Sequence, residues 1–193
     1  MRRRAGLPRW ADVLIASCGL VLLSPVIGVS MVLIRLDSSG PAIYRQRRVG
    51  RDGVEFDMLK LRTMVVGADP VGIGTAVAGD DPRVTRVGRV LRRFSLDELL
   101  NLVNVLRAEM VIIGPRPTIP AQVELYTAQQ RRRLEVRPGI TGWAQINGRI
   151  GIPWEERIEL DVWYVENRSL RLDLKILART GRLLATGQGL DPA

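Results

Sequence analysis

A long apolar run opens the chain: between Val13 and Ile34 there is no charged side chain. A straight apolar helix of about 20 residues is long enough to cross the hydrocarbon layer of a membrane. Ser24 and Pro25 stand at the centre of this run, and a proline removes one backbone hydrogen bond and crowds the carbonyl four residues earlier, here that of Val21. We therefore predict a helix that breaks at Ser24-Pro25, where the serine hydroxyl can satisfy the freed carbonyl.

Arginines flank the apolar run on both sides, at positions 2, 3, 4 and 9 before it and at 35, 45, 47 and 48 after it. Because basic flanks favour the cytoplasmic side of a membrane, both ends are expected there. Residues 1–36 are accordingly predicted to dip into the bilayer as a re-entrant hairpin with a basic N-terminus, and each arm of about 10 residues would rise about 15 Å. A straight membrane-crossing anchor, a signal peptide and a buried core helix are the alternatives.

The remainder, residues 37–193, has the length of one globular domain, which is expected on the cytoplasmic side with both ends of the apolar run. Apolar and polar positions over Ile43–Val49 and Val54–Leu61 are typical of extended chain, and the Gly-Arg-Asp-Gly sequence between them is typical of a turn, so we predict a β-hairpin. The segment Gly67–Asp81 is rich in glycine, alanine and aspartate and has no clear period, which predicts a mobile loop; such a loop could close over a ligand, and a plain surface connection is the alternative.

Helical spacing follows the predicted loop. Arg83, Arg86, Arg89 and Arg92 recur every third residue among apolar positions, which predicts a short basic amphipathic segment. Ser95 to Glu98 fits a capping box, and the helix that it would begin should run to about Met110. Further predicted elements are helices over Pro120–Leu134, Trp154–Glu166 and Leu172–Ala185 and an irregular turn over Arg137–Gly142. The predicted fold class is mainly α with a small β-hairpin or sheet (α+β).

The amino-acid composition limits which metal sites and catalytic mechanisms the protein can use. The formal net charge is +9 and nearly all cations are arginines, since Lys60 and Lys175 are the only lysines. The guanidinium group suits phosphate, so lipid headgroups, nucleotides or nucleic acid are candidate partners. There is no histidine, and Cys18 is the only cysteine, which argues against zinc clusters, disulfide frameworks and Ser-His or Cys-His catalysis. Carboxylates are left as nucleophiles or bases, and a hard cation such as Mg²⁺ as the metal.

Asp97 and Glu98 are the acids best placed for such chemistry. Helix capping alone would account for both of them. The surrounding charge favours a chemical role, because Arg92 precedes the acids closely and Arg116 stands in a proline-bracketed loop after the predicted helix. A carboxylate beside bound phosphate can bind magnesium, or attack phosphorus to form an acyl phosphate.

The chain resembles the bacterial sugar transferases, the small monotopic polyprenyl-phosphate phosphoglycosyl transferases. The motifs that carry the resemblance are Asp81-Pro82-Arg83, Ser95-Leu96-Asp97-Glu98-Leu99, Gly114-Pro115-Arg116-Pro117, Pro138-Gly139-Ile140-Thr141-Gly142-Trp143 and the spaced residues Asp161, Tyr164, Asn167, Ser169 and Asp173. Together with the Ser-Pro break in the apolar run, these ordered motifs extend over essentially the whole chain.

The resemblance implies transfer of a phosphosugar from a UDP-sugar to undecaprenyl phosphate, with release of UMP, as the first step of bacterial surface-glycan assembly (exopolysaccharide, capsule, O-antigen or glycoprotein). It implies that Asp97 is the nucleophile of a covalent phosphosugar intermediate and that Mg²⁺ is required, with Asp97 and Glu98 as metal ligands. Arg92 and Arg116 match positions associated with phosphate binding, and Lys60 matches a basic position near the site, although a solvated strand lysine is an equal interpretation. The expected location is the cytoplasmic face of the bacterial inner membrane, and a homodimer is among the open oligomeric states.

Two interpretations from other functional classes remain open on the sequence alone. A membrane-tethered basic module that binds nucleic acid or anionic lipid without catalysis would explain the charge and the anchor, but it gives Asp97 and Glu98 no task, and few aromatics are present for base stacking. We therefore expect no nucleic-acid partner. An inactive scaffold component of a glycan-assembly complex is the other alternative.

Overall fold

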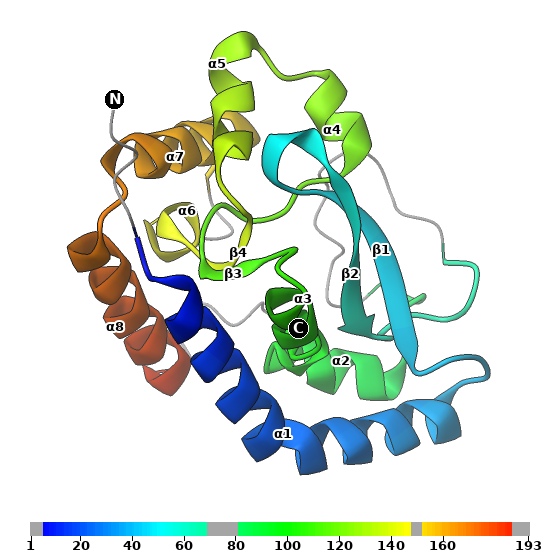
Figure 1. Cartoon of the computed structure of the whole chain (residues 1–193). Helices are drawn as coiled ribbons and strands as arrows, with labels where there is room; N and C mark the ends of the chain where they lie inside the picture. The colour runs from blue at the N-terminus through cyan, green and yellow to red at the C-terminus, as the bar shows by residue number, and fades with distance from the viewer. Residues whose placement is uncertain (1–5, 69–80, 148–151, 187–193) are drawn as a thin grey trace.

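The computed structural model describes residues 6–68, 81–147 and 152–186. The chain forms, in order, α1 (Arg9–Asp37), β1 (Ile43–Val49), η1 (Arg51–Gly53), β2 (Glu55–Leu61), α2 (Arg86–Arg93), η2 (Leu96–Glu98), α3 (Asn101–Leu106), β3 (Val111–Ile113), α4 (Pro120–Glu124), α5 (Ala128–Arg131), η3 (Arg132–Glu135), β4 (Gly139–Thr141), α6 (Trp143–Asn147), α7 (Trp154–Asn167) and α8 (Leu170–Thr186). Figure 1 shows these elements gathered around β3 and β4, with α1 along one edge. The predicted fold class, mainly helical with small sheets, is confirmed.

Helix α1 bends about half way along its length (Figure 1) and contains Pro25. The Ser24 hydroxyl donates to the carbonyl of Val21 over 2.8 Å, which is the carbonyl that Pro25 leaves without its helical partner. This predicted compensation is confirmed. The backbone remains helical through the bend, so the break is a kink within one helix and not a loop between two.

Both arms of α1 pack on the same globular domain. The first arm is fixed by Asp12, whose Oδ1 accepts from the Ile112 amide at 3.0 Å, and by the buried Ala16. The second arm buries Ile34 against Leu61 of β2 and neighbouring residues of α2. The outer face of α1 is left exposed, and large apolar side chains such as those of residues 21, 22 and 29 are more than half exposed.

By length and composition α1 is able to cross a membrane, and 11% of its most apolar 18-residue window is buried. A helix in the core of a soluble domain would bury most of such a window, so this exposure argues against the buried-core alternative.

The predicted β-hairpin is confirmed: β1 and β2 pair antiparallel, with Tyr44 opposite Lys60. The connecting turn places Asp52 in the left-handed region at φ 56°, followed by Gly53 at φ 82°. Such conformations favour glycine and aspartate, which explains the turn sequence. The register puts Tyr44, Gln46, Arg48 and Lys60 on one face of the hairpin.

Helices α2, α7 and α8 confirm the three corresponding predictions, but two other predicted helices are wrong in extent. The helix expected from Ser95 to Met110 is split into η2 and α3, and it ends at Leu106 because Ala108 adopts φ 61° and the Asn104 carbonyl accepts from the two amides of residues 109 and 110. The helix expected over Pro120–Leu134 is divided into α4, α5 and η3, and Thr127 begins α5 with its own capping box.

The irregular turn expected over Arg137–Gly142 is instead partly a strand, since β4 pairs in parallel with β3. Gly114 and Gly139 allow this pairing: a Cβ on Gly139 would lie 2.0 Å from the Gly114 nitrogen. Glycine is therefore required where these two backbones meet. Of the loop predicted over Gly67–Asp81, residues 69–80 lie outside the described residues.

Candidate active site

The two candidate acids lie on a short 3₁₀ turn between α2 and α3, so the predicted capping box is wrong. Ser95 has a left-handed backbone at φ 53°, and its side chain makes no capping hydrogen bond. A left-handed residue ends the preceding helix instead of beginning the next one. Glu98, which would have closed the box, directs its carboxylate at cations from other elements.

Glu98 is held between two cations. Lys60 of β2 donates from Nζ to Oε1 over 2.9 Å, while Arg116 donates from Nη2 to Oε1 over 2.6 Å and from Nη1 to Oε2 over 3.2 Å. The side chains of Lys60 and Glu98 are 15% and 19% exposed. Burial alone raises the pKa of Glu98, but the charges and hydrogen bonds of Arg116 and Lys60 outweigh burial and hold this pKa well below its usual range. Glu98 is therefore ionised, and Lys60 is not a solvated strand lysine.

Asp97 is next to this cluster of ion pairs, but among the described residues it forms no ion pair or hydrogen bond within it. Within the described part of the chain, no residue donates a hydrogen bond to the Asp97 carboxylate. Burial, and after it the charge of Glu98, raise the pKa of Asp97 to about 6, although Lys60, Arg92 and Arg116 act in the opposite direction. Adjacent carboxylates with pKa values driven apart are the usual basis of separate chemical roles. Asp97 is the carboxylate left available to a ligand.

Two further arginines complete the positive surroundings of the acids. Arg92 of α2 acts electrostatically on Asp97, and its Nε donates to Thr63 Oγ1 over 2.9 Å. Arg48 of β1 interacts electrostatically with Glu98 and Arg116, and burial, followed by the charge of Arg116, lowers the pKa of Arg48 to about 10.

Sequence reasoning missed Arg48, although a signal was present. Arg48 has the same strand parity as Tyr44, which the hairpin register places opposite Lys60. Alternation along the predicted strand therefore put Arg48 and Lys60 on one face.

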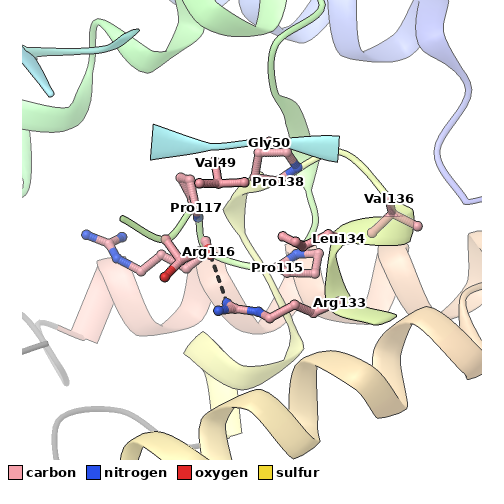
Figure 2. A pocket seen from close by; sticks show the side chains of 10 residues that line it. Val49, Gly50, Pro115, Arg116, Pro117, Arg133, Leu134, Val136 and Pro138 are labelled. Carbon is pink, nitrogen blue, oxygen red and sulfur yellow. Dashed lines mark hydrogen bonds between the residues drawn. The ribbon is translucent and has the colours of Figure 1, made fainter. Parts of the chain in front are cut away.

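Arg116 extends from the loop that follows β3. Figure 2 shows its side chain pointing away from a small pocket that is enclosed by this loop, the end of β1 and the chain around η3. Neither Asp97 nor Glu98 is among the described residues that line this pocket. The Arg116 side chain is 47% exposed, so a ligand over the acids can reach it.

The predicted site residues are thus brought together: the charges of Lys60, Arg92, Glu98 and Arg116 all act on Asp97. They come from β2, α2, η2 and the loop after β3. Ser24 and Pro25 are separate from this cluster and belong to the kink of α1.

The carboxylates of the site can be compared with the oxygen ligands that Mg²⁺ requires. Among the residues that the structure describes, no group of three or more Asp, Glu, Cys or His side chains forms a metal site. Magnesium in phosphoryl-transfer sites is commonly bound by one or two carboxylates together with substrate phosphates. Asp97 fits that pattern, whereas both oxygens of Glu98 already accept hydrogen bonds from cations.

Comparison with known proteins identifies the family. The family model for bacterial sugar transferases matches residues 3–187. The uncharacterized sugar transferase EpsL of Bacillus subtilis is 44% identical over 185 residues, which are 96% of this chain and 90% of that protein. The UDP-glucose:undecaprenyl-phosphate glucose-1-phosphate transferase of Caulobacter vibrioides is 42% identical over 186 residues, or 92% of this chain and 69% of that protein.

A third relative, the galactosyl transferase CpsE of Streptococcus agalactiae, is 38% identical over 192 residues, or 94% of this chain and 42% of that protein. These matches confirm the resemblance stated from the motifs and the expectation of an enzyme. They extend over the kinked helix, the acidic turn and the arginine-bearing loop alike. The chain therefore belongs to the bacterial sugar transferase family.

Proposed function

We propose that the protein transfers a phosphosugar from a UDP-sugar to undecaprenyl phosphate and releases UMP, and that this reaction initiates assembly of a bacterial surface glycan. The observation that carries the proposal is the pair of acids with divided roles. Glu98 is ion-paired with Lys60 and Arg116, while Asp97 accepts no hydrogen bond from the described residues and lies among the same cations.

In the proposed mechanism, Asp97 is the nucleophile. One of its carboxylate oxygens bonds to the phosphorus that carries the sugar, and the bond between that phosphorus and the bridging oxygen of the diphosphate breaks, so that UMP leaves with the bonding electrons. A phosphate oxygen of undecaprenyl phosphate then bonds to the same phosphorus and displaces the carboxylate. The lipid-linked diphosphosugar is the product, and Asp97 is regenerated.

The cations around the acids suit the charge of this reaction. A dianionic diphosphate approaching Asp97 would meet Arg92 and Arg116, whose guanidinium groups match phosphate oxygens in geometry as well as charge. Lys60 offsets part of the negative charge of Glu98, and Glu98 holds Arg116 in place through their ion pair. Developing charge on the leaving phosphate is thus stabilised by groups that are already oriented.

Magnesium is part of the proposal. Asp97 together with the substrate phosphates would hold the ion, with Glu98 as the second carboxylate if its ion pairs rearrange. When bound, the ion would neutralise diphosphate charge and favour departure of UMP.

The kinked α1 supports placement of the site at the membrane surface. Both arms of α1 pack on the catalytic domain, and its exposed face is apolar. A re-entrant hairpin would seat that face in the cytoplasmic leaflet while the acids remain at headgroup depth. There a soluble donor and a lipid-bound acceptor could use Asp97 in turn.

The test is UMP release by the purified protein with a panel of UDP-sugars, undecaprenyl phosphate and Mg²⁺. We expect one or more UDP-sugars to be used, and incubation with donor alone to add the mass of a phosphosugar to the wild type but not to Asp97→Asn. An active Asp97→Asn protein would overturn the nucleophile assignment. Absence of UMP release with every donor, combined with salt-dependent binding to RNA or anionic vesicles, would favour the non-catalytic basic module.

A further inference from the structure

The loop that carries Arg116, residues 114–118, is bonded from several sides through consecutive carbonyls. The bonds are Gly139 N to Pro115 O at 2.8 Å, Arg133 Nη2 to Arg116 O at 2.9 Å, Arg48 Nη1 to Pro117 O at 3.1 Å and Val49 N to Thr118 O at 2.8 Å. Pro115 and Pro117 also restrict the backbone on either side of Arg116. These bonds fix the backbone of the loop, and the backbone in turn sets the direction in which the Arg116 side chain leaves it.

Arg133 is the only one of these donors whose guanidinium group is itself deeply buried in an ion pair. Its side chain is 7% exposed and that of Asp161 is 3% exposed, with Nη2 of Arg133 2.5 Å from Oδ2 of Asp161. Nη1 of Arg133 donates to the hydroxyl of Tyr126. One rigid guanidinium thus connects α7, the chain after α4 and the carbonyl of Arg116.

Stability alone is a weak reason for such an arrangement, because apolar residues of similar volume often stabilise a core as well as a buried ion pair does. What the ion pair provides is direction: a guanidinium fixed at one end by a carboxylate presents its remaining N–H groups at fixed angles. In Figure 2 the Arg133 guanidinium meets the backbone of Arg116, while the Arg116 side chain extends the other way.

We propose that the buried Arg133–Asp161 ion pair is a positioning device for Arg116, which it holds in the direction that engages Glu98 and the substrate phosphates. This inference rests on the proposed function for its effect on turnover. Arg133 and Asp161 are positioning residues, because neither is among the groups that act on Asp97.

The test is a double-mutant cycle between Arg133→Lys and Arg116→Ala. Lysine keeps a positive charge for Asp161, but its side chain is one bond shorter and has a single nitrogen. It therefore cannot occupy both the position of Nη1, which contacts Tyr126, and that of Nη2, which contacts Asp161 and the Arg116 carbonyl. We expect Arg133→Lys to lower kcat about tenfold or more when Arg116 is present and less than about twofold when Arg116 is alanine, since coupled residues are not additive. Equal losses in the two backgrounds would overturn the proposal. Arg132→Lys, at the neighbouring, partly exposed arginine, is the matched control and should leave kcat unchanged.

A second variant covers the case in which Arg133→Lys does not fold. The triple change Tyr126→Phe, Arg133→Met and Asp161→Leu removes the polar cluster together and keeps its volume, so no buried charge is left alone. A folded triple variant with wild-type kcat would refute the positioning role, and a folded triple variant whose kcat is about tenfold or more below that of the wild type would support it.

A readout without substrate separates this inference from the proposed function. The Arg116 guanidinium signals in an NMR spectrum, assigned by their disappearance in Arg116→Ala, report its ion pair with Glu98. We expect these signals to shift and broaden in Arg133→Lys and in the triple variant but not in Arg132→Lys. Unchanged signals would sink the inference even if the wild type is active, and a shift would uphold it even if no UDP-sugar is used.

Discussion

Lys60 and Glu98, from β2 and the acidic turn, form an ion pair in which Nζ lies 2.9 Å from Oε1. This pair and Arg116 keep Glu98 ionised. Burial, and after it the negative charge of Glu98, raise the pKa of the neighbouring Asp97 to about 6. Glu98 is thus ion-paired and stays ionised, whereas the raised pKa of Asp97 lets this carboxyl group change its protonation state at mildly acidic pH.

The first half-reaction is expected to have an acid limb near pH 6. Asp97 attacks only as the carboxylate, so protonation below its pKa of about 6 should lower the rate about tenfold for each further pH unit. The measurement is the pH dependence of adduct formation with UDP-sugar alone, so that ionisation of the lipid phosphate does not contribute. A rate constant that stays level from pH 7 to pH 4.5 would contradict the assignment.

Glu98→Gln is expected to move that acid limb to lower pH. The substitution removes a negative charge that raises the pKa of Asp97 and leaves Lys60 and Arg116, which lower it. The variant should also be slower and less stable by about 1–3 kcal/mol, because two cations lose their charged partner. The pH–rate profile and thermal unfolding measure the two effects, and an acid limb that stays in place would show that Glu98 does not tune Asp97.

Asp97→Asn is expected to abolish turnover while stabilising the fold near neutral pH. The pKa of Asp97 is raised by folding, so its contribution to stability is fully present below the unfolded pKa of 3.8 and is lost as the pH rises through about 6. Asparagine avoids this loss, and we expect a gain of about 1–2 kcal/mol at pH 7.5 that disappears near pH 4. Thermal unfolding of both proteins at the two pH values checks the sign, and a destabilised variant at pH 7.5 would contradict it.

Arg116→Ala is expected to lower kcat/KM for the UDP-sugar by about 10²–10³, the usual effect of deleting one oriented charge-stabilising donor. Membrane association should be retained, because Arg116 lies outside α1. The control is Arg131→Ala, another exposed arginine, which should be close to wild type. Equal catalytic efficiency in the two variants would remove Arg116 from the phosphate site.

The kink in α1 predicts that both ends of the chain lie on the cytoplasmic side. Protease-sensitive tags at the N-terminus and the C-terminus should both be protected in spheroplasts and both be cleaved in inverted vesicles. Pro25→Ala restores the helical N–H donor to the Val21 carbonyl, and we expect part of the variant to cross the membrane and expose its N-terminal tag. Tags on opposite sides in the wild type would establish a spanning helix instead.

The sequence by itself determined the elements whose information is local. The apolar run with its Ser24-Pro25 break, the β1–β2 hairpin and the periodic helices α2, α7 and α8 could be predicted because side-chain period and turn residues act over a few positions. The motifs also identified the family and the residues around Asp97.

Only the tertiary structure decided how Ser95 to Glu98 fold and which residues support the site. A capping box is favoured locally, but the Glu98 carboxylate gains more from Lys60 and Arg116, which are distant in sequence. The parallel pairing of β3 with β4 and the ion pair of Arg133 with Asp161 likewise join segments about 28 residues apart. Local propensity carries no information about such partners, because their energy exists only once the chain has brought the two segments together.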